Sequence, residues 1–103
     1  MKIYFERSGG FAGIFSSTTV DTQSLSSKES SQLKNLVDEA NFFELPSKLF
    51  QPSKTTKSAA DYFVYKITIQ NNNQSKHSVE CNDVNMQPTL RPLINLLTRY
   101  FGR

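Results

Sequence analysis

Hydrophobic and polar residues alternate with a period of two in four stretches of the chain. These stretches are residues 2–6, 14–20, 62–69 and 76–81. Alternation of this kind is typical of strands with one buried face, and β-branched and aromatic residues support the interpretation. The first two stretches are close enough in sequence to pair as a hairpin.

Two other stretches repeat apolar residues at the spacing of an amphipathic helix. Before the first of them, Ser26 and Glu29 form a capping box, which predicts a helix start, and the helix should end near Asn41. We predict the second helix over residues 90–101, with Thr89 as its cap. The apolar stripes of the two helices are Leu33, Leu36, Val37 and Ala40, then Leu90, Leu93, Ile94, Leu97 and Phe101.

The predicted order of elements is strand, strand, helix, strand, strand, helix. A four-stranded antiparallel sheet with two helices packed on one face would bury every apolar stripe, so we predict an α+β fold. Most of the core would consist of Ile3, Phe5, Leu36, Phe63, Tyr65, Ile67, Ile69, Leu93 and Leu97.

The segment between the two halves has two parts. Phe42, Phe43 and Leu45 are followed by Pro46, and we expect them to pack back under the sheet. Residues 47–60 are polar with little to bury, which predicts a flexible loop. Residues 1–103 are expected to form a single domain.

Composition excludes several classes of protein. The chain is 37% hydrophobic and 20% charged, as in ordinary globular proteins. Its net charge is +3, but the basic residues are spread along the chain among acidic ones, so we expect no nucleic-acid partner. No apolar run reaches the roughly 20 residues that cross a bilayer, and the start lacks a secretory signal, so we expect no membrane association and a cytoplasmic location. The single cysteine, Cys81, fits a reducing compartment.

Signals of catalysis are weak, and we predict no enzyme, no metal and no cofactor. The single histidine, His77, lies in a predicted strand and is interpreted as a structural residue, and Cys81 as a small buried one. The glycine-rich stretch lacks the lysine and Ser/Thr of a phosphate-binding loop and joins two strands rather than leading into a helix.

The glycine-rich stretch between the first two strands is nevertheless unusual. Its glycines can turn the chain and let another backbone approach, which leaves Phe11 near the tip of a hairpin. Two interpretations stay open: Phe11 covers the open end of the sheet, or it is presented to a partner. In the second case the candidate contact residues are Arg7, Ser8, Gly9, Gly10, Phe11, Ala12 and Gly13.

Residues 7–14, RSGGFAGI, after an amphipathic strand, resemble the opening of the emfourin family of small protein inhibitors. Members of this family inhibit thermolysin-like zinc metalloproteases. The resemblance covers nearly the whole chain, and residues 47–60 depart from it. The further similar stretches are residues 20–22, 40–46, 61–69, 77–79 and 90–93.

The resemblance implies a non-enzymatic inhibitor whose partner is a thermolysin-like metalloprotease. Separately, we expect the protein to be a monomer. Thermolysin-like enzymes favour a bulky apolar side chain beside the scissile bond, and Phe11 at a rigid hairpin tip would fill that subsite. The turns at residues 71–74 and 82–85 are the alternative contact sites. The alternative function is a small protein-interaction module with a different partner and no inhibitory activity.

Overall fold

The computed structural model describes residues 1–9, 14–48, 63–71, 75–83 and 85–101. This part has an α+β fold with a four-stranded antiparallel sheet and two α-helices, as predicted. Two 3-10 turns, η1 and η2, lie on either side of α1, and the predicted order did not include them. The elements are β1 (Lys2–Gly9), β2 (Ile14–Asp21), η1 (Thr22–Ser24), α1 (Ser27–Glu39), η2 (Phe42–Glu44), β3 (Phe63–Gln70), β4 (Lys76–Asn82) and α2 (Arg91–Thr98).

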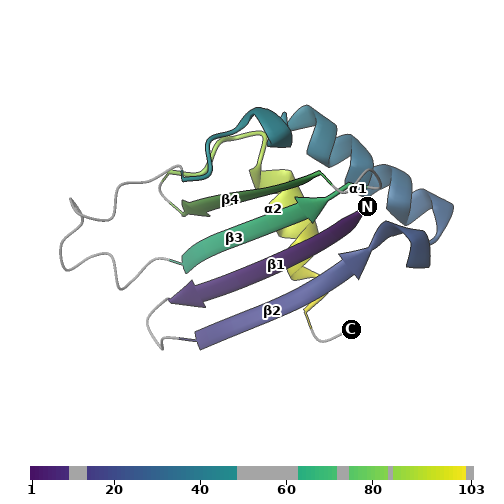
Figure 1. The fold of residues 1–103 in the computed structure, drawn as a ribbon. Coiled ribbons are helices and arrows are strands. Elements are labelled where there is room, and N and C mark those ends of the chain that lie inside the picture. The colour runs from purple at the N-terminus through teal and green to yellow at the C-terminus, as the bar shows by residue number, and fades with distance from the viewer. Residues whose placement is uncertain (10–13, 49–62, 72–74, 84, 102–103) are drawn as a thin grey trace.

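The strands lie in the order β2-β1-β3-β4, so β2 and β4 form the two edges of the sheet (Figure 1). Each neighbouring pair is antiparallel, and β1 pairs with β2 and β3 over its whole length. Because β1 and β3 are central, their alternating residues bury the inner face most completely. Ile3, Phe5, Ile67 and Ile69 are fully buried there.

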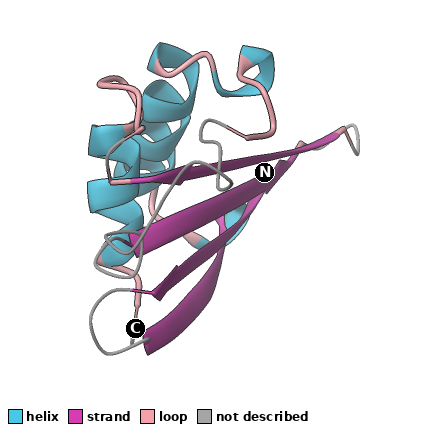
Figure 2. Cartoon of the chain, turned by 90° about the vertical axis from the view of Figure 1, so that its left-hand side faces the viewer, coloured by secondary structure: helices cyan, strands magenta, loops and turns pink. Residues whose placement is uncertain are grey.

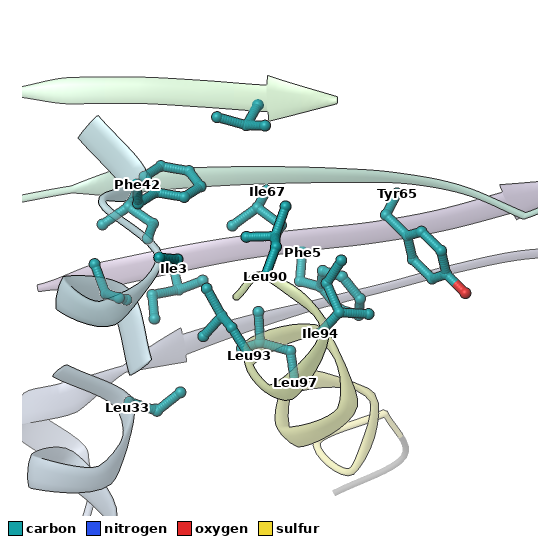
Figure 3. Packing of buried hydrophobic residues seen from close by; sticks show 14 of the residues in the cluster. Ile3, Phe5, Leu33, Phe42, Tyr65, Ile67, Leu90, Leu93, Ile94 and Leu97 are labelled. Atoms are coloured by element: carbon teal, nitrogen blue, oxygen red, sulfur yellow. The ribbon is translucent and has the colours of Figure 1, made fainter. Parts of the chain in front are cut away.

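Both described α-helices cover the same face of the sheet, as predicted, and none of the described helices lies over the opposite face (Figure 2). Side chains of α2 lie against those of β1 in the centre of the core (Figure 3). Two predicted core residues, Leu36 and Phe63, are only half-buried at its margin. Phe63 is the first residue of β3, at the end of the sheet, and in α1 the residues that face the core are Leu33 and Val37.

The capping box predicted for α1 is present. The Oγ atom of Ser26 accepts a hydrogen bond from the Glu29 amide at 3.2 Å and lies 3.3 Å from the Glu29 carboxylate. The helix ends at Glu39, and Asn41 follows with a φ of 50°, a left-handed value that asparagine tolerates better than most residues. The start and end of α1 therefore follow from short-range chemistry that the sequence displays.

The last helix starts within one residue of the predicted position, but its cap residue and its C-terminal end were predicted wrongly. The helix α2 spans Arg91–Thr98, its N-cap is Leu90 and not Thr89, and no side chain caps it. Pro92 in the first turn has no backbone N–H, so one fewer amide there needs a hydrogen-bond partner. The Leu90 side chain does not cap the helix and is buried in the core. Beyond Thr98 the chain continues in tight turns in which each amide bonds to the carbonyl three residues before it. None of the described helices is long and apolar enough to cross a lipid bilayer.

The segment after α1 packs against β4. Phe42 is buried as expected, whereas Phe43 is exposed. The His77 ring of β4 bonds to the Leu45 carbonyl at 2.7 Å. Most of the predicted flexible loop, residues 49–60, lies outside the described residues. The first two residues of the predicted loop, Ser47 and Lys48, lie beside β4, because the Glu80 amide donates to the Ser47 carbonyl at 2.8 Å and Lys48 forms a parallel bridge with Glu80.

Candidate functional site

The strand register shows which loops share an end of the sheet. Gly9, the last residue of β1, is paired with Ile14 and with Phe63, the first residue of β3. Val64 is paired in turn with Asn82, the last residue of β4. Gly9, Ile14, Phe63 and Asn82 therefore lie at one end of the sheet, which we call the hairpin end (Figure 1).

Of the third candidate, the predicted 71–74 turn, only Asn71 is described, and it lies at the opposite end of the sheet. Lys2 at the start of β1 is paired with Gln70, and Gln70 with Lys76, so the β3–β4 connection is about a strand length from Gly9. Asn71 lies beside Met1 and Phe43 in a depression of about 330 Å³. One partner surface can therefore contact Gly9 together with Asn82 and Asp83, but not together with Asn71.

The predicted contact residues at the hairpin end divide into three groups: residues 10–13, then Ser8 with Gly9, and Arg7. Gly10, Phe11, Ala12 and Gly13 lie outside the described residues. Ser8 and Gly9 are half-buried at the end of β1, and Gly9 has a φ of 96°, where a side chain would be strained.

The Arg7 side chain packs against aromatic rings of the protein itself. Its guanidinium lies 4.7 Å from the centre of the Phe63 ring and 5.0 Å from that of Phe101. Cation–π contacts of this kind contribute about 1 kcal/mol each. The Phe101 ring also stacks on Phe5 at 5.2 Å. Arg7 therefore joins β1, β3 and the segment after α2, and its side chain is engaged within the protein.

Asp83 makes a second connection at this end. One carboxylate oxygen accepts a hydrogen bond from the Tyr65 hydroxyl at 2.8 Å, and the other from the Phe63 amide at 3.1 Å. The Arg91 guanidinium lies 3.9 Å from the same carboxylate. Burial and, next, the bond to Asp83 raise the pKa of Tyr65 to about 12, so the hydroxyl stays a donor. Asp83 thus fixes the start of β3 to the start of α2.

An exposed aromatic residue at the hairpin end was not among the predicted contacts. Phe15 in β2 is 62% exposed, more than Phe43 at 36%, the other exposed large hydrophobic among the described residues. It is paired with Ser8, which is paired in turn with Val64, so these three share the outer face of the sheet. The period-two pattern puts Phe15 on the same face of the strand as Ser17 and Thr19, and a large apolar residue on such a polar face is the signal that could have identified it.

The residues with potential for chemistry are used for packing. His77 contacts the Phe42 and Phe43 rings and the Leu45 carbonyl, which fits its interpretation as a structural residue. Cys81 is buried, and burial raises its pKa to about 12, so the reactive thiolate is scarcely populated at neutral pH. Within the described ranges, no three His, Cys, Asp or Glu side chains are grouped so that they could hold a metal ion.

Comparison with known proteins gives one result. No curated protein and no solved structure matches the chain. The family model described as Emfourin matches residues 5–98, which is nearly the whole chain and covers β1 from Phe5 onward, the other three strands and both helices. This family suggests a role in metalloprotease inhibition. With the sequence resemblance and the family model in agreement, the chain belongs to the emfourin family.

Proposed function

We propose that this protein inhibits thermolysin-like zinc metalloproteases by placing the hairpin end of its sheet in the active-site cleft. Family membership supports the class of partner. The observation that supports the location is Phe15, a largely exposed aromatic side chain six residues from Gly9 in sequence and on the strand paired with it. A cleft that favours bulky apolar groups would bury this ring.

The hairpin end is held in place before any partner binds. Arg7 between Phe63 and Phe101 connects the end of β1 with the start of β3, and Asp83 connects the start of β3 with α2. A surface that is already ordered loses less conformational entropy on binding, so more of the contact energy becomes affinity. Inhibition then consists of steric exclusion of substrate and requires no chemistry from the inhibitor.

Phe11 remains the predicted contact from the sequence, and Phe15 is the contact that we add from the structure. The two residues have the same chemistry and are four positions apart. Both can contribute, because a protease cleft has several successive subsites. The half-buried Ser8 and Gly9 would then contact the cleft wall through backbone, while Arg7 acts within the inhibitor.

The test is a titration of a thermolysin-like protease with the wild type, Phe15→Ala and Phe11→Ala. We expect Phe15→Ala to weaken inhibition by a factor of about 10 or more, as truncation of an interface aromatic does. Its thermal unfolding temperature should stay within a degree or two of the wild type, because an exposed ring contributes little to the core.

Phe43→Ala is the matched control. It makes the same change at an exposed aromatic residue, but at the opposite end of the sheet beside Met1 and Asn71. We expect inhibition within a factor of two of the wild type. If the wild type does not inhibit, the proposed function is wrong. If Phe43→Ala weakens inhibition and Phe15→Ala does not, the contact surface lies at the other end.

A further inference from the structure

The two edges of the sheet differ in whether the protein's own chain covers them. Along β4, Ser47 and Lys48 lie beside Glu80 and close part of that edge. Along β2, no described segment pairs with the outer side of the strand. An edge strand in this state presents unpaired amides and carbonyls to any extended backbone.

The sequence of β2 contains none of the usual features that prevent such pairing. From Ile14 to Val20 it has no charged residue and no proline, and Asp21 is the first charge. Proteins commonly protect open edges with lysine, proline or a covering segment. The β4 edge carries Lys76 and Glu80 in addition to its covering segment.

The geometry points to the β2 edge as a strand-addition surface for the protease. This inference rests on the proposed function. A protease binds its substrate as an extended chain, and the wall of its cleft therefore offers backbone groups spaced to pair with a strand. Pairing of residues 14–20 with that wall would be β-augmentation, in which backbone hydrogen bonds supply affinity and alternate side chains supply specificity.

The side chains of β2 are consistent with this arrangement. On the outer face, Phe15 is followed by Ser17 and Thr19, and all three are exposed. One large aromatic group would enter a subsite, and the two small residues after it would let the cleft wall approach the strand. On the inner face, the Thr18 hydroxyl lies 3.4 Å from the Tyr100 carbonyl, so the strand stays attached to its own core.

The position of β2 also favours this partner over a second copy of the chain. The strand begins at the hairpin end, so its edge continues the surface proposed to enter the cleft. Pairing there places the open edge and Phe15 against one partner. A symmetric pair of β2 strands would instead cover both copies of this surface, and a dimer of the free protein is an outcome that the experiment can detect.

The experiment uses proline, which removes one backbone donor. Successive amides of an edge strand point alternately toward the neighbouring strand and away from it, so one of Ser16→Pro and Ser17→Pro removes only an outward amide. The other variant loses an amide that bonds to β1 and should be less stable, so thermal unfolding shows which of the two variants has lost only the outward amide. We expect that variant to inhibit at least 10-fold more weakly than the wild type. Alanine at the same position, which keeps the amide, should inhibit within a factor of two.

Hydrogen exchange gives an independent readout if both proline variants unfold. In the wild type, alternate amides of residues 14–20 should exchange fast in the free protein and at least 10-fold more slowly in the complex with the protease. The amides of β4 serve as the internal control and should change little.

The outcomes separate the two proposals. If the wild type does not inhibit, both proposals are wrong. If the wild type inhibits, but the folded proline variant inhibits equally well or the β2 amides gain no protection, strand addition is wrong and the proposed function stands. A free protein that sediments as a dimer with its β2 amides already protected would also overturn strand addition to the protease.

Discussion

The two edges of this sheet belong to strands of similar length, and the protein treats them differently. The β4 edge is covered by the segment after α1, through the Ser47 carbonyl, the Lys48 bridge and the bond from the His77 ring to the Leu45 carbonyl. The β2 edge is uncovered within the described part of the chain. The difference shows that this fold can cover an edge with its own chain, so the open edge at β2 is a candidate for use by a partner.

The largest expected effect comes from the anchor of the covering segment. Phe42 is buried at 1% exposure in the core, and its ring contacts Phe43 and His77. We expect Phe42→Ala to lower the free energy of unfolding by about 3 to 5 kcal/mol, measured by urea denaturation, because the change leaves a cavity in the core. The amide of Glu80, which bonds to Ser47, should exchange faster because its partner segment has lost its anchor.

Phe15→Ala is the matched change on the other edge. We expect it to alter the free energy of unfolding by less than about 0.5 kcal/mol, since Phe15 is largely exposed. The two variants should therefore show opposite effects: a loss of stability with inhibition retained below the unfolding temperature for Phe42→Ala, and the reverse for Phe15→Ala. If Phe42→Ala and Phe15→Ala lowered the free energy of unfolding by similar amounts, the side chains at the two edges would contribute equally to stability, and the contrast between the edges would be wrong.

The elements and their order could be predicted because each has a local signal. Period-two alternation fixed the strands of the sheet, and the Ser26–Glu29 capping box fixed the start of α1. The end of α2 had no such signal. Its apolar stripe continues to Phe101, but the chain after Thr98 forms tight turns in which Tyr100 and Phe101 pack against the sheet.

The site was less predictable, because it depends on contacts between residues far apart in sequence. A basic residue beside a glycine-rich turn looks like a contact residue, and only the packing shows that Arg7 lies between Phe63 and Phe101. The covering of β4 by Ser47 and Lys48 was also missed, because the sequence of a polar segment gives no signal that it will form a β-bridge with a strand. Phe15 was not among the predicted contacts, because its exposure depends on which face of the sheet the two helices cover.

The next effect is a dependence of stability on pH that comes from the β3 and β4 side. Burial raises the pKa of both Tyr65 and Cys81 to about 12, from 10.0 and 9.0. The folded state thus holds the protons of these two groups more tightly than the unfolded state. The contribution of the two groups to the free energy of unfolding is therefore fully present below pH 9 and is lost as the pH rises toward 12. We expect a loss on the order of 2 kcal/mol at pH 10.5, measured by urea denaturation against pH 8.

The control for this prediction removes the two titrating groups and keeps most of the packing. Tyr65→Phe with Cys81→Ala should show a smaller loss between pH 8 and pH 10.5 than the wild type. The strand β2 has no tyrosine or cysteine, so Phe15→Ala should follow the wild-type curve. An equal loss in the double variant would assign the pH dependence to other groups.

The smallest effect concerns the charge at the covered edge. The Lys48 ammonium lies 4.0 Å from the Glu80 carboxylate, and the two side chains are 60% and 31% exposed. An exposed ion pair contributes at most about 1 kcal/mol, and the Glu80 amide bond to the Ser47 carbonyl involves no side chain. We expect Lys48→Ala to lower the free energy of unfolding by less than about 0.5 kcal/mol in urea denaturation, and the exchange rate of the Glu80 amide to stay unchanged. If that amide exchanged as fast as in Phe42→Ala, the edge would be closed by charge, and its contrast with the uncharged edge of β2 would be one of electrostatics and not of backbone pairing.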